Sequence, residues 1–218
     1  MNVEIWSDIA CPWCYVGKRR FEAARDLFEH RDSIDVVWRS FELDPGAPPV
    51  RDEDRSEHLA RKYGRTVERA RQMHERMTEV GAGEGIDFRF DRSHSVNTLD
   101  AHRLIHLAKS HGLQDQMEER LFRAHFSEGE VVSDPETLTR LAAEVCLDEG
   151  DVRDTLATDR FEAAVREDER TAAVLGIHAV PFFVVDRALG VAGAQPAEVL
   201  LELLRQGWRT RNPVAATR

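Results

Sequence analysis

The alternation of apolar and polar positions at the start of the chain predicts a short strand followed by a helix. Val3 and Ile5 alternate with polar neighbours before the polar pair at 7–8, as in a half-buried strand. From Pro12 onward, apolar residues recur every three to five positions with charged residues between them, which is typical of an amphipathic helix. A second strand is expected at 34–43. Strand, helix and strand in this order predict a right-handed βαβ unit.

The pattern of the middle of the chain is helical. Segment 42–50 contains three prolines and a glycine and ends the strand pattern, and segment 85–95 has the character of a connection. Strand features return only in 178–208, where the pattern predicts a strand, a turn, a short strand and a helix. Five segments between these points have helical periodicity, the first interrupted near Gly64: 55–81, 97–112, 113–129, 134–147 and 158–176.

These elements predict an α/β protein whose sheet domain is split in the sequence. Residues 1–43 together with 177–218 are expected to form the sheet domain, and residues 44–176 an all-helical insertion. The chain has 218 residues, of which 42% are hydrophobic, so it can build a substantial core without disulfides.

Charge and hydropathy narrow the classes of partner. The chain carries 30 basic and 40 acidic residues, a formal net charge of -10, and it has no large basic block. We therefore expect no nucleic-acid partner, because phosphate binding needs clustered positive charge. No stretch approaches the roughly 20 apolar residues of a membrane span, and the N-terminus lacks the build of a secretion signal. We expect a cytoplasmic protein without a membrane partner.

Two cysteines lie at the carboxyl end of the first predicted strand, where open α/β sheets place their sites. Cys11 stands where the chain enters the helix, and Pro12 occupies the first helical turn. Free N–H groups and the helix dipole at this position favour the thiolate of Cys11, which makes it the nucleophile. Cys14 lies one turn deeper and is placed to resolve a mixed disulfide by attacking Cys11.

Two other interpretations of the cysteine pair are weaker. A pair of ordinary buried thiols explains neither the spacing nor the position between strand and helix. A zinc site needs four nitrogen or sulfur ligands, and the chain has no second C-x-x-C motif. His102 and His106 lie on one helix face, but such a pair alone is more often solvated or packed. No metal site is predicted.

Three further residues are interpreted as packing residues. Cys146 falls on the apolar side of its helix with Leu138 and Leu141, so we expect it to be a small buried hydrophobe. Trp38 and Phe41 lie in the second predicted strand and are expected to pack in the core.

The chain resembles the DsbA-like thioredoxin-fold oxidoreductases of the FrnE type. The resemblance spans nearly the whole chain and rests on six segments in the same order: "SDIACPWCYVGK", "FELDPG", "NTLDAHRLIHLA", "LFRAHFSEG", "VPFFVVD" and "GAQP". It implies a thioredoxin fold, with strand order βαβ and then ββα along the chain, around a large all-helical insertion. It also implies that Cys11 and Cys14 form a redox-active disulfide and that the Val180–Pro181 bond beside them is cis.

The resemblance also implies where a substrate binds. A cis proline turns the backbone N–H and C=O of Val180 toward the thiols, where an extended substrate can pair with them. The residue pattern itself adds Asn97, which is expected to cap its helix and is a candidate for binding a carboxylate such as that of glutathione. The expected substrate-binding residues are Pro12, Trp13, Val180, Pro181 and Asn97.

Three functions follow from these observations. The first is a thiol:disulfide oxidoreductase that acts on proteins or small molecules, with no permanently bound cofactor and with glutathione as a possible co-substrate. The second is a glutathione-dependent isomerase or transferase, because the 2-hydroxychromene-2-carboxylate isomerases and kappa-class glutathione transferases share the superfamily. Those relatives typically carry serine where Cys11 stands, and serine cannot form a disulfide. The third is a non-catalytic accessory role in a biosynthetic pathway.

Overall fold

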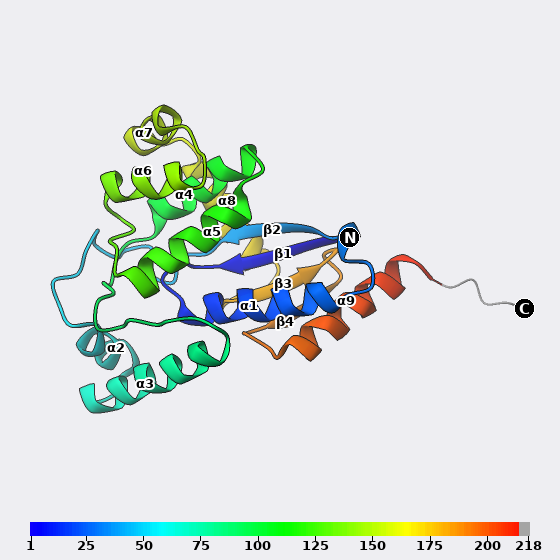
Figure 1. The fold of residues 1–218 in the computed structure, drawn as a ribbon, viewed down its shortest axis with the longest axis horizontal. Coiled ribbons are helices and arrows are strands. Elements are labelled where there is room, and N and C mark those ends of the chain that lie inside the picture. The colour runs from blue at the N-terminus through cyan, green and yellow to red at the C-terminus, as the bar shows by residue number, and fades with distance from the viewer. Residues whose placement is uncertain (214–218) are drawn as a thin grey trace, which may run out of the picture.

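The computed structural model describes residues 1–213 and is built around a four-stranded mixed sheet (Figure 1). The strand order is β2-β1-β3-β4, with β1 parallel to β2 and antiparallel to β3, and with β3 antiparallel to β4. The four strands are β1 (Asn2–Ser7), β2 (Asp35–Ser40), β3 (Phe182–Val185) and β4 (Leu189–Ala192). The sequence-based expectation of a thioredoxin fold is confirmed.

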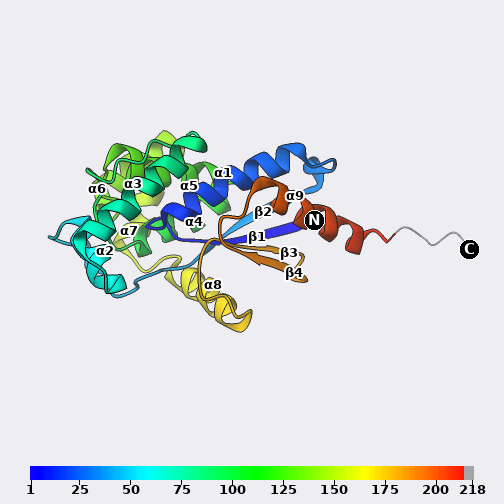
Figure 2. The same cartoon turned by 90° about the horizontal axis from the view of Figure 1, so that it is seen from below.

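Helices cover both faces of the sheet (Figure 2). Helices α1 (Pro12–Leu27) and α9 (Ala197–Arg211) lie on one face, and α8 (Glu162–Val174) lies on the other. Successive side chains of β1 alternate between these faces, as the period of a strand requires. Val3 and Ile5 pack in the cluster with α1 and α9, and Trp6 packs with residues of α8. The indole Nε1 of Trp6 also donates to the carbonyl of Asp168 at 3.0 Å.

All the other α-helices lie between β2 and β3 in the sequence. They are α2 (Arg55–Tyr63), α3 (Val67–Gly83), α4 (Leu99–Ser110), α5 (Gln114–Arg123), α6 (Pro135–Glu144) and α7 (Glu149–Ala157), with a π-helical turn at Ala124–Glu128 after α5 and a 3-10 turn at Arg31–Ser33 before β2. The expected break near Gly64 separates α2 from α3, since Gly64 adopts the left-handed conformation with φ 60°.

Helix α7 was not expected from the sequence. It has nine residues, begins with the Asp148 cap and buries only Val152 and Thr155. A helix that buries so little leaves almost no apolar periodicity in the sequence, so the pattern of 148–157 does not separate it from a loop.

The expectation that Cys146 is buried is wrong. Leu138 and Leu141 are fully buried, but α6 ends at Glu144 and Cys146 adopts a left-handed conformation with φ 69°. The helical turn that would have buried Cys146 is therefore not completed, and its thiol is exposed. Leu147 takes the buried position instead.

Helix α1 packs closely against the segment that precedes β3. Gly17 faces Pro181, and a Cβ atom on Gly17 would lie 2.8 Å from Cγ of that proline. This close approach brings the start of α1, with both cysteines, next to the Val180–Pro181 bond. Among the residues that the structure describes, no helix combines the length and the apolar character needed to cross a membrane.

Candidate active site

The two cysteines lie at the start of α1. Cys11 is the N-cap residue and its N–H donates to the carbonyl of Asp8 at 3.0 Å, while Pro12 fills the first helical position. Cys11 is 5% exposed and Cys14 is 1% exposed, whereas the Trp13 side chain is 45% exposed. The motif therefore presents a tryptophan to solvent and holds both thiols beneath it.

The thiols contact each other and the backbone before Pro181. The Sγ of Cys11 lies 3.7 Å from the carbonyl oxygen of Val180, and the Val180–Pro181 bond is cis. Burial raises the pKa of the Cys14 thiol well above its usual range, and its hydrogen bond with Cys11 adds to this effect. Cys14 is therefore protonated at neutral pH. Neither cysteine is bonded in a disulfide.

A buried carboxylate, Asp8, supports the loop before Cys11. It accepts hydrogen bonds from the N–H groups of Ala10 and Leu43, at 3.1 and 2.7 Å. The Nε2 atom of His102, on α4, lies 3.5 Å from Oδ1 of Asp8. Burial acts to raise the pKa of Asp8, but His102 and the two N–H groups outweigh it and hold that pKa below the usual value. His102 is thus the ion-pair partner of Asp8.

A second buried carboxyl, Glu118 on α5, lies behind the same strand. Ser7 Oγ, at the end of β1, donates to Oε1 of Glu118 at 2.7 Å. Burial raises the pKa of Glu118 to about 7, because the charged form is poorly solvated there. Glu118 therefore changes its protonation state near neutral pH.

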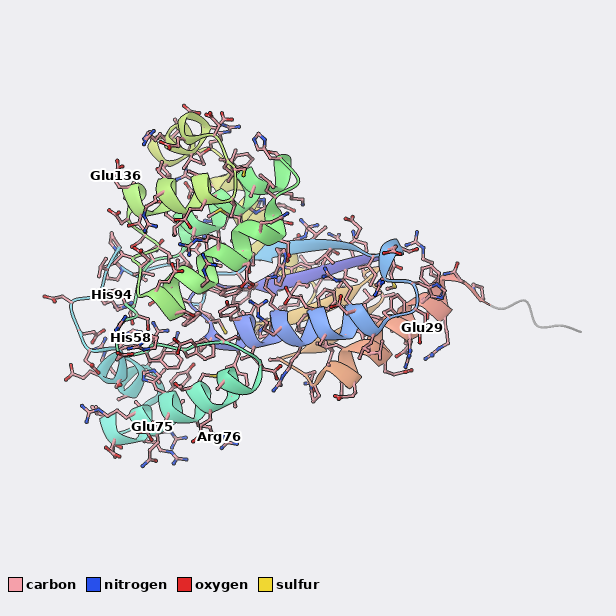
Figure 3. The ribbon with its side chains drawn as sticks, in the orientation of Figure 1. Glu29, His58, Glu75, Arg76, His94 and Glu136 are labelled. Carbon is pink, nitrogen blue, oxygen red and sulfur yellow. The ribbon has the colours of Figure 1, made fainter. Side chains whose placement is uncertain are left out.

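A cavity of about 210 Å³ opens beside Cys11. One wall comes from α2 and α3, which lie apart from the other helices of the insertion (Figure 1). Figure 3 labels His58 of α2 and His94 of the 84–98 connection on this side of the molecule, whereas Glu75 and Arg76 of α3 point outward. The cavity lies where the helical segment meets the cysteine motif.

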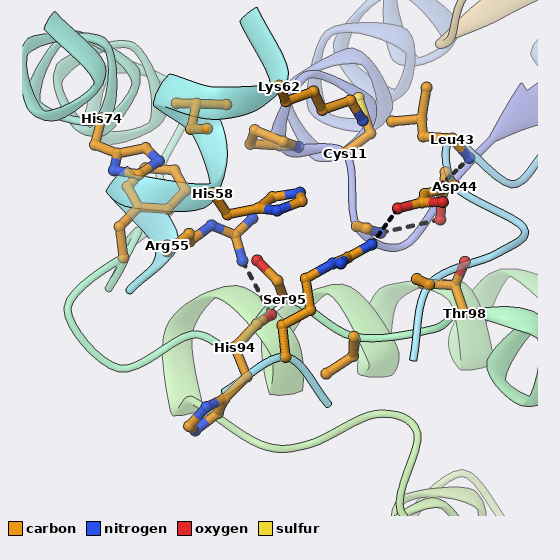
Figure 4. Close-up of a pocket in the computed structure, with 18 of the residues that line it drawn as sticks. Cys11, Leu43, Asp44, Arg55, His58, Lys62, His74, His94, Ser95 and Thr98 are labelled. Atoms are coloured by element: carbon orange, nitrogen blue, oxygen red, sulfur yellow. Dashed lines mark hydrogen bonds and ion pairs between the residues drawn. The ribbon is translucent and has the colours of Figure 1, made fainter. Parts of the chain in front are cut away.

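Helix α2 presents three basic side chains to the cavity. Arg55, His58 and Lys62 recur at helical spacing and extend toward the side where Cys11 lies (Figure 4). These three residues were not predicted from the sequence, and neither were Asp8 or a partner for His102. The spacing of the three basic residues was the available signal, but their position relative to Cys11 depends on how α2 folds back.

Asn97 lies outside the lining of this cavity, and both ends of its side-chain amide bond within the protein. Its Oδ1 accepts from the N–H of Leu99 at 2.9 Å, and its Nδ2 donates to the carbonyl of Ala47 at 3.1 Å. The expected N-cap is wrong by one residue: Thr98 occupies the N-cap position of α4, and Asn97 precedes it and accepts from the first-turn N–H of Leu99. Thr98, unlike Asn97, is among the residues that line the cavity.

Histidines of this region do not form a metal site with neighbouring groups. Within residues 1–213, no group of three or more histidine, cysteine, aspartate or glutamate side chains is arranged to hold a metal ion. His106, the second histidine of α4, pairs with Asp168 at 3.1 Å from its Nε2 atom.

A paired-cysteine motif at a helix start, opposite a cis proline in a mixed sheet, defines a thioredoxin-fold protein with a dithiol site. The family model of the DSBA-like thioredoxin domain matches residues 2–205, so the chain belongs to that family. Structural neighbours agree with this assignment. A probable DsbA oxidoreductase from Streptomyces coelicolor is 46% identical, with a TM-score of 0.93 over 98% of this chain and 92% of the other.

More distant relatives extend the comparison. The uncharacterized protein YwbO of Bacillus subtilis is 29% identical over 196 residues, which cover 88% of this chain and 92% of YwbO. The cytosolic disulfide reductase DsbM of Pseudomonas aeruginosa is 16% identical, with a TM-score of 0.68 over 96% of this chain and 100% of DsbM. A 2-hydroxychromene-2-carboxylate isomerase is 14% identical, with a TM-score of 0.72 over 97% and 98% of the two chains. The last two similarities show a shared fold.

Proposed function

We propose that the protein is a thiol:disulfide oxidoreductase that uses Cys11 as the nucleophile and Cys14 as the resolving thiol. The observation that carries the proposal is the placement of both thiols at the start of α1, in contact with each other and next to the Val180 carbonyl. Membership of the DsbA-like family supports it.

The reaction follows from the two thiol environments. In the reducing direction, the Cys11 thiolate attacks a substrate disulfide, forms a mixed disulfide and releases one substrate thiol. Cys14 then loses its proton and attacks the Cys11 sulfur, which releases the second substrate thiol and leaves a Cys11–Cys14 disulfide. Two electrons and two protons pass from the protein to the substrate. The reverse sequence oxidises a substrate dithiol.

The high pKa of Cys14 suits the resolving role. A protonated thiol does not compete with Cys11 for the incoming disulfide, because only the thiolate is nucleophilic. Resolution requires Cys14 to lose its proton. Burial opposes this loss, and so does the charge of the buried Asp8, because both raise the pKa of Cys14. Pro12, Trp13, Val180 and Pro181 surround the thiols and are the proposed substrate contacts.

The substitution Cys14→Ser tests the proposal. It is made in a Cys146→Ser background because Cys146 is exposed and would form its own adducts. After treatment with a small disulfide, we expect Cys14→Ser to accumulate a stable mixed disulfide at Cys11, measured by peptide mass spectrometry. Cys11→Ser should accumulate no such adduct, and the protein with both cysteines should release it. Failure to trap any adduct at Cys11 would refute the attack-and-resolve mechanism.

A glutathione-dependent isomerase or transferase is the second candidate. The cavity beside Cys11 favours it, because a thiol bound there lies next to the helix start. DsbM, a fold neighbour, has been crystallised with glutathione, and another neighbour is a 2-hydroxychromene-2-carboxylate isomerase. This candidate predicts that turnover with glutathione survives in Cys14→Ser, whereas an oxidoreductase that depends on both thiols loses its activity.

A further inference from the structure

Arg55 is a charged side chain without a carboxylate partner; burial lowers its pKa, and the charge of Cys11 acts to raise that pKa. Among residues 1–213, no carboxylate lies within ion-pairing distance of its guanidinium. Its Nη1 atom donates to the carbonyl of His94 at 3.1 Å and lies 3.4 Å from Nε2 of His125. Its Cζ atom lies 5.5 Å from the ring centroids of Phe90 and of Phe126. Aromatic rings and a carbonyl thus hold the cation without neutralising it.

Two histidines near Arg55, His74 and His125, are uncharged at neutral pH. Burial lowers the pKa of His74 to about 4, and the charge of Arg55 adds to this effect. Burial and Arg55 likewise hold the pKa of His125 well below its usual range. Burial also lowers the pKa of Arg55, to about 10, so the guanidinium is still charged at neutral pH. Partly buried charges in proteins are usually paired, which makes this one unusual.

The other charges around the cavity are already matched. Arg51 pairs with Asp44 at 2.5 Å, and Asp8 pairs with His102. Two cations of the lining remain without a carboxylate partner among the described residues. Arg55 lies inside the cavity, and Lys62 lies at the exposed rim of the cavity. The cavity is therefore positive, although the whole chain has a formal net charge of -10. Such a local excess attracts anions selectively.

We propose that Arg55 binds a carboxylate of an acidic thiol or disulfide substrate while the sulfur of that substrate reacts at Cys11. The inference deepens the proposed function and rests on it. A guanidinium binds a carboxylate through two parallel hydrogen bonds, so it fixes orientation as well as charge. Trp13, Tyr63 and Met73 line the cavity with exposed apolar surface that suits the carbon skeleton between carboxylate and sulfur.

The first experiment compares small disulfides that differ in charge. Reduced protein is oxidised with 3,3′-dithiodipropionate, which is anionic, with the neutral 2-hydroxyethyl disulfide and with cationic cystamine. Each reaction converts the two thiols of the protein into a disulfide and the added disulfide into two thiols. Because the three reagents differ in intrinsic reactivity, the quantity compared between variants is the ratio of the anionic rate constant to the neutral one.

Arg55→Gln should lower this ratio about tenfold or more, which corresponds to the loss of one hydrogen bond to a charged group. The ratio for Arg55→Lys should lie between those of the unsubstituted protein and Arg55→Gln, because lysine keeps the charge but cannot form the two parallel hydrogen bonds of a guanidinium. Arg65→Gln is the matched control, since Arg65 is exposed, lies two residues after α2 and is absent from the cavity lining. The proposal would be overturned if Arg55→Gln changed neither this ratio nor the rate with the acidic peptide described next, or if Arg65→Gln lowered the ratio equally.

A disulfide-bonded peptide with aspartates beside its cysteine forms a further arm. Arg55 dependence for the peptide alone would assign the carboxylate to a polypeptide substrate, and dependence for dithiodipropionate to a small one. Either result supports carboxylate binding by Arg55.

A second measurement does not depend on redox activity. The alkylation rates of Cys11 with iodoacetate and with iodoacetamide give an anionic-to-neutral ratio, and the exposed Cys146 of the same molecule supplies the internal reference. We expect Arg55→Gln to lower the ratio at Cys11 and to leave it unchanged at Cys146. If this ratio responds but no disulfide oxidises the protein, the proposed function fails and anion binding stands. If disulfides oxidise the protein but neither ratio depends on Arg55, the proposed function stands and carboxylate binding by Arg55 is refuted.

Discussion

Glu118 is a single residue whose protonation changes the stability of the protein. Its pKa is about 7 in the folded protein and about 4.3 in an unfolded chain, because burial in the folded state disfavours the charged form. The folded protein therefore retains a proton that the unfolded chain releases. The free energy of unfolding should fall as pH rises from about 4.3 to about 7 and then remain constant with respect to this group.

Glu118→Gln tests this linkage. A glutamine can still accept the hydrogen bond of Ser7 but does not titrate. Urea unfolding at pH 5 and at pH 8 should show that the substitution is more favourable at pH 8 than at pH 5, by roughly 1–3 kcal/mol. An equal effect of the substitution at the two pH values would mean that the pKa of Glu118 is the same in the folded and the unfolded protein.

Single residues also show what a sequence reveals about a site. Cys11 and Cys14 are recognisable because their spacing and their position before a helix carry chemical meaning within one local segment. Arg55 and Asp8 are not, since their roles depend on which distant groups lie beside them. A lone arginine or aspartate in a sequence does not indicate whether a partner neutralises it in three dimensions.

At the scale of elements, the contact between α1 and the segment before β3 positions the site. A Cβ atom at Gly17 would lie 2.8 Å from Pro181, closer than such atoms normally approach, so one of the two segments must shift. We expect Gly17→Ala to lose about 1–3 kcal/mol of stability, as for other overpacked sites. It should also slow thiol–disulfide exchange, because the shift moves Val180 and Pro181 relative to Cys11.

Gly83→Ala is the matched control for this prediction. Gly83 ends α3, and a Cβ atom there would have no other atom within 4 Å. This substitution should leave both stability and exchange rate intact or raise stability slightly, since alanine favours helices. Thermal unfolding and the oxidation rate check both variants, and similar behaviour of the two would contradict the role of Gly17.

Most helices were predictable because each buries one apolar face: α1 repeats with the expected period, and Gly64 marks the break between α2 and α3. Strand β1 was expected to be half-buried, but residues 3–7 are all buried because helices cover both faces of the sheet. Helix α7 was missed because it buries little, and Cys146 was misplaced because its helix ends two residues earlier. The position of a helix end depends on local backbone conformation that the apolar pattern does not encode.

At the scale of the whole molecule, sheet and helical segment share a continuous core. One buried cluster includes Ile5 and Phe183 of the sheet together with Leu104 and Leu121 of helices α4 and α5. The division into residues 1–43 with 177–218 and residues 44–176 stays a prediction. Helices α4 and α2 supply His102 and Arg55 to a site whose cysteines lie at the start of α1, directly after β1.

The central claim, that Cys11 and Cys14 form a redox couple, is tested most directly by a redox equilibrium. Cys146→Ser protein is equilibrated in buffers of varied reduced and oxidised glutathione, quenched with acid, alkylated and mapped by mass spectrometry. The account predicts one two-electron transition in which both thiols disappear together into a Cys11–Cys14 disulfide. If Cys11 instead forms only a mixed disulfide with glutathione at every ratio while Cys14 stays a free thiol, the account is contradicted.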